Sequence, residues 1–379
     1  MRFSTKCVRT GSRITNAPVP EAVPIFQTST FEWDSLADEP EPMYTRYGNP
    51  TRYALEEALC AVENGKYALA TSSGMAAVAT ALSMLRSGDH IVCTQDVYGG
   101  TRAYIRDVLS GFGITHTFCD CADLQEFSNA LAPNTKMVWL ETPSNPILKI
   151  TNLRECASIA KQKGAIVGSD NTFASPYFQN PLDFGVDIVM HSTTKYINGH
   201  SDVLGGALVW NDDKLSEALI TYTKRAGCTP GAIECWLILR GLRTLEIRMK
   251  QHAASAMRIA EWLQTSNRCE AVFYPGLKTH RDYDIAASQM RGFSGMLSFE
   301  LEDEAACDRV LKKLNCFTLG ASLGGVSSLA SYPAKMSHAM MTAETRRQLG
   351  ATDGLIRLSI GIEDADDLIE DLDQALSEL

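Results

Sequence analysis

The chain has 379 residues, of which 45% are hydrophobic and 21% are charged, as is ordinary for a globular protein with a large core. One core rarely uses so many residues, so two domains are expected. The formal net charge of −10 disfavours nucleic acid or an anionic membrane as the main partner.

The eleven cysteines are scattered from Cys7 to Cys316, and no two of them form a C-x-x-C pair. A disulfide framework is not expected in so long a chain, so this usage indicates a reduced, cytoplasmic protein. The seven histidines do not fall at ligand spacings with the cysteines, so we expect no metal site. The first residues lack an apolar segment and no run of about 18 apolar residues occurs, so we expect neither a secretion signal nor a membrane span.

The first part of the chain shows weak periodicity and contains prolines at positions 18, 20, 24, 40, 42 and 50. This composition predicts an extended arm rather than a packed unit. An arm of this kind can wrap a partner subunit. We therefore assign residues 1–50 to an N-terminal arm that contributes to the neighbouring subunit's site.

From about Leu55 onward, short β-branched runs alternate with helical segments. Helices are predicted over residues 74–86, 100–110 and 153–163. Strands are predicted over residues 66–71, 90–94, 114–119, 136–141, 165–169, 187–191 and 207–210. This alternation indicates an α/β fold with a mainly parallel sheet that helices cover on both faces. We assign it to a large domain over residues 51–246.

The last third of the chain has its own alternation of strands and helices. Strands are predicted over residues 295–301 and 354–359. Helices are predicted over residues 252–264, 305–314 and 365–376. The pattern predicts a smaller C-terminal α/β domain over residues 247–379.

Lys195 closely follows the apolar strand predicted over residues 187–191. Parallel sheets bind ligands at the carboxyl ends of their strands, so this lysine is expected at the mouth of the sheet. A lysine amine can form a Schiff base with an aldehyde cofactor. Taken alone, the position also fits an ordinary exposed lysine, which is the commoner case.

Other residues near strand ends favour the cofactor interpretation. Asp170 could keep a pyridine nitrogen protonated, although an aspartate there also fits a helix N-cap. The small-residue loop over residues 71–77 contains Gly74 and Met75 and opens a helix whose amides could bind phosphate, but serine-rich caps are common. Tyr98 could stack on a planar cofactor or be an ordinary turn tyrosine.

Nine motifs along nearly the whole chain resemble the Cys/Met-metabolism family of pyridoxal-phosphate (PLP) enzymes. This family of trans-sulfuration enzymes includes cystathionine γ-synthase, cystathionine γ-lyase, methionine γ-lyase and the O-acylhomoserine sulfhydrylases. The motifs are YTRYGNPT at 44–51, SGMA at 73–76, VYGGT at 97–101, ETPSNP at 141–146, DNT at 170–172, STTKY at 192–196, NGHSD at 198–202, SLGG at 322–325 and RLSIG at 357–361.

The resemblance implies fold type I, the aspartate-aminotransferase-like architecture, with a large-domain sheet of seven strands. It implies pyridoxal 5′-phosphate as the cofactor. It also implies a homotetramer built as a dimer of dimers, with each active site shared across a dimer interface. A small amino acid is the expected substrate, and no metal, nucleic acid or membrane partner is expected.

The resemblance also assigns roles to individual residues. Lys195 holds the cofactor and carries protons, Tyr98 stacks on its ring and assists the leaving group, and Asp170 pairs with the ring nitrogen. The substrate carboxylate is bound by Arg357, with Ser322 and Asn145 in support. The remaining cofactor-binding residues are Gly74, Met75, Thr172, Ser192 and Thr194, with Tyr44 and Arg46 reaching over from the neighbouring subunit.

The implied reaction is γ-elimination or γ-replacement on a sulfur-containing or O-acylhomoserine-type amino acid, through a vinylglycine-type intermediate. Positions expected to be charged in the cystathionine enzymes are here Met43, Ala103 and Ala321. These residues favour an apolar distal pocket and a methionine γ-lyase-like or O-acylhomoserine sulfhydrylase-like activity as the alternative. Arg102, next to Ala103, could substitute for the missing polar groups.

Two other classes of protein fit the sequence less well. An inactive PLP-fold scaffold is opposed by the joint presence of Lys195, Asp170, Tyr98 and Arg357. A nucleotide-binding α/β enzyme would need a glycine-rich phosphate loop of known spacing after a strand, and the sequence has none. A PLP-dependent carbon–sulfur lyase or γ-replacement transferase is therefore the leading prediction.

Overall fold

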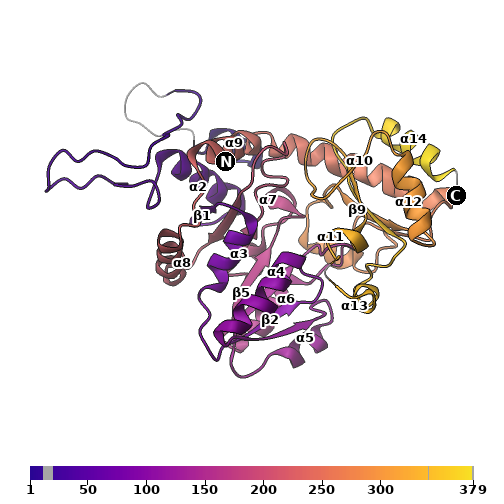
Figure 1. Ribbon diagram of the computed structural model, residues 1–379, viewed down its shortest axis with the longest axis horizontal. Helices are drawn as coiled ribbons and strands as arrows, with labels where there is room; N and C mark the ends of the chain where they lie inside the picture. Colours follow the sequence, from indigo (N-terminus) through magenta and orange to yellow (C-terminus); the bar gives the residue numbers. More distant parts are fainter. Residues whose placement is uncertain (12–19, 340, 378–379) are drawn as a thin grey trace.

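The computed structural model describes residues 1–11, 20–339 and 341–377, so residues 12–19 of the predicted arm, including Pro18, lie outside the described residues. The described chain forms a seven-stranded and a five-stranded sheet. Figure 1 shows the larger sheet, with β2 and β5, in one half of the molecule and the smaller sheet, with β9, in the other.

The larger sheet has the strand order β1–β7–β6–β5–β4–β2–β3. Neighbouring strands from β3 to β6 are parallel, whereas β7 pairs antiparallel with both β1 and β6. The predicted seven-stranded, mainly parallel sheet is therefore confirmed, with each strand bound within one residue of its prediction. The strands are β1 (Tyr67–Thr71), β2 (His90–Thr94), β3 (Thr115–Cys119), β4 (Thr135–Glu141), β5 (Ile166–Asp170), β6 (Ile188–His191) and β7 (Gly206–Trp210).

Helices cover both faces of this sheet. One face is packed by α3 (Gly74–Leu82) and α8 (Asp213–Ala226), the other by α5 (Leu124–Ala130) and α6 (Leu153–Gln162). Near the β1–β7 edge lie α2 (Pro50–Glu63) and α9 (Ala232–Leu242). The other helical segments are α4 (Gly99–Ala103), the π-helical turn η1 (Tyr104–Leu109), and the short segments η2 (Ser110–Phe112), α7 (Ser175–Phe178) and η3 (Pro181–Phe184).

Side chains of the strands alternate between the two faces. Successive side chains of a strand point in opposite directions, so a near-continuous apolar run buries both faces. Under α3 and α8 lie Ile91, Cys93, Met137, Trp139, Ile188, Met190, Leu208 and Trp210. On the opposite face lie the intervening Val92, Val138, Leu140 and Val189.

The smaller sheet has the strand order β10–β11–β12–β9–β8 and is covered by α10, α12 and α14. The strands are β8 (Ala271–Phe273), β9 (Met296–Glu300), β10 (Thr318–Leu319), β11 (Leu329–Ser331) and β12 (Leu355–Ser359). The helices are α10 (Leu245–Ser266), α11 (Tyr283–Gln289), α12 (Glu304–Lys313), η4 (Pro333–Lys335), α13 (Ala343–Gln348) and α14 (Ala365–Leu376).

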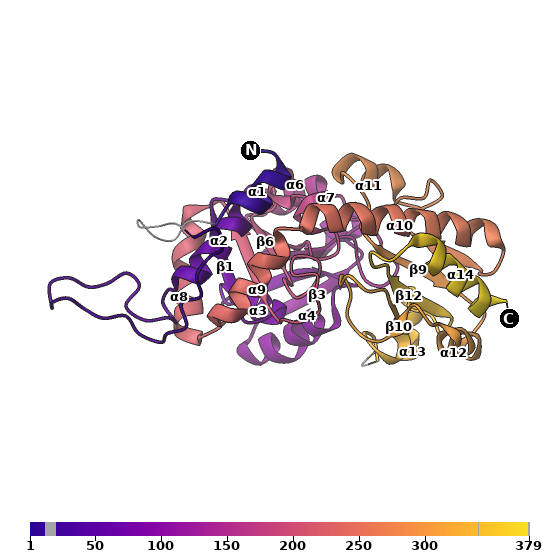
Figure 2. The same cartoon turned by 90° about the horizontal axis from the view of Figure 1, so that it is seen from above.

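Helix α10 runs along the molecule from the larger sheet to the smaller one (Figure 2). It begins at Leu245, close to the boundary expected between residues 246 and 247, although the division into domains stays a prediction. Its Met249 belongs to the core beside the larger sheet, whereas its Ile259 packs with Leu297 and Ile356 of the smaller sheet. One helix thus holds the two sheets together.

The N-terminal segment contains both a helix and an extended loop. Helix α1 (Phe3–Arg9) contacts α2 and α10. This packed helix was not expected in a segment predicted to be an extended arm. Further along, a loop leaves the body of the molecule in both views, with one bridge between Thr30 and Tyr44 (Figures 1 and 2). Leu36, between the two bridged residues in sequence, is 99% exposed. Within the described residues, no helix has the length and the apolar content that a membrane crossing requires.

Candidate active site

A cavity of about 800 Å³ lies between the carboxyl ends of the parallel strands and the smaller sheet. Parallel sheets bind ligands at this place, and the volume falls in the range of small-molecule sites. Eight residues predicted from the sequence as site residues line this one cavity: Tyr98, Asn145, Asp170, Thr172, Thr194, Lys195, Ser322 and Arg357.

Lys195 lies in a tight turn after β6, where its backbone N–H donates to the Ser192 carbonyl. Its Nζ donates to the Ser322 Oγ at 2.6 Å. Burial, helped by the Arg357 guanidinium, lowers the pKa of Lys195 from 10.5 to about 8. A lysine with this pKa is partly neutral near physiological pH, as attack on an aldehyde requires.

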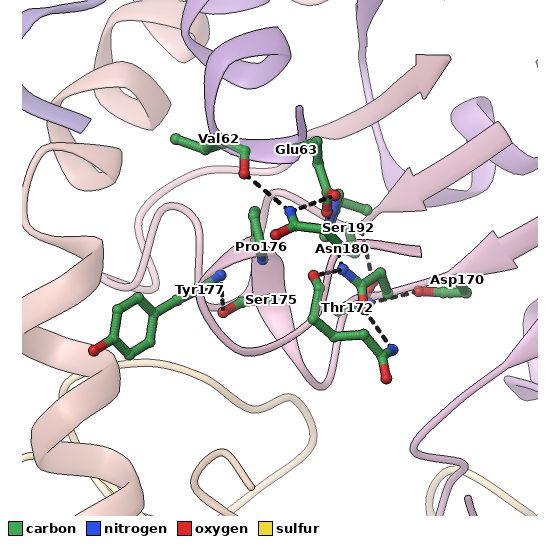
Figure 3. Close-up of polar contacts among 12 residues, drawn as sticks. Val62, Glu63, Asp170, Thr172, Ser175, Pro176, Tyr177, Asn180 and Ser192 are labelled. Atoms are coloured by element: carbon green, nitrogen blue, oxygen red, sulfur yellow. Dashed lines mark hydrogen bonds and ion pairs between the residues drawn. The ribbon is translucent and has the colours of Figure 1, made fainter. Parts of the chain in front are cut away.

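Asp170 ends β5, and its buried carboxylate accepts a hydrogen bond from the Thr172 backbone N–H at 2.9 Å. The Thr172 hydroxyl in turn accepts from the Ser192 backbone N–H at 2.9 Å (Figure 3). Burial raises the pKa of Asp170, and no ion pair in the described part of the chain includes it. A cationic ring nitrogen would supply the partner that such a carboxylate lacks.

A buried polar network supports the loops that follow β5 and β6. The Glu63 carboxylate accepts a hydrogen bond from Asn180 at 3.0 Å (Figure 3). It also accepts one from Asn171 at 2.9 Å, and it pairs with His191 at 2.5 Å. All four side chains are buried. Asn171 and His191 are the chain neighbours of Asp170 and Ser192, so this network fixes both loops. Sequence reasoning missed it, because its members are far apart in the chain.

The start of α3 and the loop after β6 approach each other closely. Ser73 caps α3 by accepting from the Ala76 N–H at 3.1 Å. A Cβ at Gly74 would lie 3.0 Å from the Ser192 Cβ and 3.1 Å from its Oγ. Only glycine fits here without a shift, so the first turn of α3 can lie against the loop that carries Ser192. Met75 follows Gly74 in the first turn. Thr194 lines the cavity, whereas Gly74, Met75 and Ser192 do not.

Tyr98 and Glu141 line the cavity together with Asp170. The Tyr98 side chain is 48% exposed, and its backbone N–H donates to Glu141 at 2.7 Å. Glu141 ends β4 in register with Asp170. Burial and the adjacent Asp170 raise the pKa of Glu141. No role for Glu141 was predicted from its sequence position. In the structure, its carboxylate holds the backbone of Tyr98.

Arg357 comes from β12 and reaches the same cavity, where it is only 5% exposed. It donates to the Asn145 side chain at 2.8 Å and to the Ser322 carbonyl at 3.0 Å. Its Nε is buried and has no hydrogen-bond partner among the described residues. Burial lowers the pKa of Arg357 to about 10, so it remains a cation at neutral pH. A carboxylate would satisfy both its charge and its orphaned N–H.

The arm residues Tyr44 and Arg46 do not line this cavity. They border a second, smaller cavity of about 460 Å³, together with Gly231 of the segment before α9. Arg46 donates to the Lys224 carbonyl at 2.7 Å. In a single copy of the chain these two residues are therefore separate from Lys195, as expected if they serve a neighbouring subunit.

The end of the cavity that the sequence predicts to be apolar holds a mixture of residues. Ala103 and Ala321 line it as expected, whereas Met43 does not. Arg102 lines it too, but its guanidinium donates to the Gln95 carbonyl at 2.8 Å and stacks 4.0 Å from the Phe118 ring. Two charged residues that the sequence analysis missed, Arg106 and Asp107 of η1, line the same cavity. They follow Ala103 by about one helical turn, the spacing that could have indicated them.

Comparisons with known proteins identify the family to which this site belongs. A family model described as Cys/Met metabolism PLP-dependent enzyme matches residues 4–377. The chain belongs to this family. It is 46% identical to the cystathionine beta-lyase MetC of Bacillus subtilis (strain 168), over 94% of this chain and 92% of the relative. It is 45% identical to the cystathionine gamma-lyase of the same organism, over 94% of both chains.

A solved structure agrees with these relatives. The cystathionine gamma synthase from Xanthomonas oryzae pv. oryzae, in complex with aminoacrylate and cysteine, has a TM-score of 0.97 and 44% identity, over 100% of this chain and 98% of that one. The predicted family and fold type are confirmed. The chain is a PLP-dependent enzyme of carbon–sulfur chemistry that acts on an amino acid. The reaction predicted from the sequence takes place at the γ-carbon only, whereas one of these relatives is named a cystathionine beta-lyase.

The residues present fit PLP. Lys195 offers an amine to its aldehyde, and the unpaired Asp170 carboxylate suits its ring nitrogen. The backbone amides at the start of α3, which Gly74 lets lie against Ser192, suit its phosphate. Each of these groups lies at or just after the carboxyl end of a strand of the larger sheet, so one planar cofactor can contact all of them.

Proposed function

We propose that the chain cleaves cystathionine by elimination at the γ-carbon, releasing cysteine, 2-oxobutyrate and ammonia with the uptake of one water. The observation that carries this proposal is the presence of Lys195 and Arg357 in one cavity, the first with a lowered pKa and the second with an orphaned Nε. The names of the similar relatives support cystathionine as the substrate.

Three residues would carry the reaction. Arg357 binds the substrate α-carboxylate with its free N–H and so orients Cα toward Lys195. Lys195 takes the proton from Cα and can move it onward, since among the described residues the Ser322 hydroxyl is the one hydrogen-bond partner of its amine. Tyr98, which lines the same cavity, would stack on the cofactor ring and could give a proton to the leaving sulfur. When bound, PLP supplies an electron sink for the negative charge that develops at Cα.

The cofactor would be held by groups already near one another. Asp170 and Thr172 would hold the ring, while Gly74, Met75, Ser192 and Thr194 would bind the phosphate. Asn145 and Ser322 would hold Arg357 in place, as their hydrogen bonds with it support.

We also propose a homotetramer, built as a dimer of dimers, in which Tyr44 and Arg46 complete the site of a neighbouring subunit. The exposed loop that carries them and their distance from the cavity of their own chain support this assembly. A reducing, cytoplasmic location is supported by the eleven cysteines, all of them free thiols.

Elimination at the β-carbon is a second candidate, favoured by the relatives named cystathionine beta-lyase. It needs only the proton transfer at Cα, whereas γ-elimination also needs one at Cβ. The same cavity could serve either reaction, because Lys195 and Tyr98 both line it.

Product analysis separates the two. Purified holoenzyme is incubated with cystathionine, and the 2-oxo acid and thiol are identified by mass spectrometry. We expect 2-oxobutyrate and cysteine; pyruvate and homocysteine would establish the β-lyase instead. If cystathionine yields neither pair while an O-acylhomoserine is converted with an added thiol, the proposed lyase function is wrong and a replacement enzyme takes its place.

A further inference from the structure

Arg106 and Asp107 form an ion pair on η1 that lines the cavity. Two bonds join their side chains, from Nε to Oδ1 at 2.6 Å and from the terminal nitrogen to Oδ2 at 2.7 Å. The side chains are 50% and 55% exposed, whereas Arg357 in the same cavity is 5% exposed. The pair therefore marks the mouth of the cavity, and Arg357 marks its inner end.

The other charged residues of the cavity are engaged in other contacts. Arg102 is held by Gln95 and Phe118, and Glu141 by the backbone of Tyr98. The remaining three, Asp170, Lys195 and Arg357, form the inner site described above. In the described part of the chain, the side-chain hydrogen bonds of Arg106 and Asp107 join these two residues to each other.

We propose that Arg106 and Asp107 bind the second amino-acid group of the substrate, the one at the far end from the reacting carbon. The Arg106 guanidinium would take its α-carboxylate and the Asp107 carboxylate its α-ammonium. The assignment deepens the proposed function and rests on it, since cystathionine carries an amino-acid group at each end. It replaces the apolar distal pocket expected from Ala103 and Ala321.

The chemistry of the pair suits this task. A guanidinium and a carboxylate side by side are complementary to a zwitterion, and the guanidinium fork matches a carboxylate with two hydrogen bonds. Exposed ion pairs add little stability, so the pair opens readily for a ligand. Ala103 and Ala321 line the same cavity, and their short side chains leave space for the ligand. The π-helical turn also fits, because such turns are frequent at functional sites.

The test compares two substrates in the holoenzyme. Arg106→Ala and Asp107→Asn are assayed with cystathionine and with O-acetylhomoserine, which has no second amino-acid group. We expect kcat/KM for cystathionine to fall roughly 10–100-fold in each variant, as for a lost charged hydrogen bond, and to change less than about twofold for O-acetylhomoserine. Arg106→Lys keeps the charge without the fork and should lie between Arg106→Ala and the parent.

Arg281→Ala is the matched control, because Arg281 also pairs with the next residue, Asp282, but does not line the cavity. It should leave both substrates unchanged. Cystathionine binding, measured from the absorbance change of the bound cofactor, tests the role of the pair even if cystathionine is not cleaved. Binding without cleavage would overturn the proposed function but not the assignment of the pair. Equal losses on both substrates, or parent-like cystathionine binding in Arg106→Ala, would overturn the assignment of the pair.

Discussion

The Lys195 amine lies 2.6 Å from the Ser322 hydroxyl, a contact that joins the larger sheet to the C-terminal part of the chain across the cavity. Ser322 has a φ of 98°, a conformation that only glycine adopts readily. Its carbonyl also accepts from Arg357 at 3.0 Å. One strained residue thus holds both the amine and the guanidinium, and strain of this kind is typical of functional sites.

Replacing Ser322 separates its hydroxyl from its backbone conformation. Ser322→Ala removes the hydroxyl and keeps the strained φ, whereas Ser322→Gly removes both. Both variants should lose roughly tenfold in kcat/KM, because each loses the hydrogen bond to Lys195. The glycine variant should unfold at higher denaturant concentration, with a free energy of unfolding about 1 kcal/mol above that of the alanine variant. An alanine variant with parent activity would show that the hydroxyl has no role.

Asp170→Asn should keep the cofactor bound and lower kcat roughly 100-fold or more. The neutral amide cannot keep the ring nitrogen protonated, so the ring becomes a poor electron sink. Cofactor content is measured by absorbance and kcat by 2-oxo acid release. Asp187→Asn, at the opposite end of the adjacent strand β6, is the control and should retain activity. Near-normal turnover in Asp170→Asn would show that this carboxylate serves only as a structural cap.

The lowered pKa of Lys195 predicts a pH dependence for the binding of PLP to the cofactor-free protein. Only the neutral amine attacks an aldehyde. With a pKa of about 8, the neutral and reactive fraction of the amine shrinks steadily below pH 8, so the rate of cofactor uptake should rise with pH and level off above about 8. Stopped-flow absorbance measures the rate, with N-acetyl-lysine as the reference amine. A rate that keeps rising past about pH 10, as for an ordinary lysine, would contradict the lowered pKa.

A shared active site predicts recovery of activity in mixed dimers. Arg46→Ala and Lys195→Ala should each be strongly impaired. Mixed in equal amounts under conditions of subunit exchange, they should regain about one quarter of parent activity, since half of the dimers are mixed and each of these has one intact site of two. Lack of recovery, with exchange verified by mass spectrometry, would count against the arm as part of the neighbouring site.

The central site residues could be predicted because they follow strands with clear apolar patterns. Asp170 ends β5, and Lys195 comes four residues after the end of β6. Fully buried strands of a parallel sheet appear in a sequence as short apolar runs, which is why all seven were found. The polar residues directly after such runs meet at one edge of the sheet, so proximity followed from order along the chain.

Other features escaped prediction for physical reasons. Helix α9 is apolar on most of its surface, so its sequence lacks the periodicity that marks an amphipathic helix. Helix α8 could have been found, because Asp212 caps its start and Gly227, with a φ of 76°, ends it. The Glu63–His191 pair joins residues 128 positions apart, and the sequence alone does not indicate which distant residues meet.

The proposed chemistry depends on the attachment of the cofactor to Lys195, and peptide mapping can locate that attachment. The holoenzyme is reduced with borohydride, digested and mapped by mass spectrometry, which locates the lysine that carries the cofactor. The pyridoxyl label should be found on Lys195, the lysine that lines the cavity beside Asp170 and Arg357. A label on any other lysine, with Lys195 unmodified, would contradict the account of the active site.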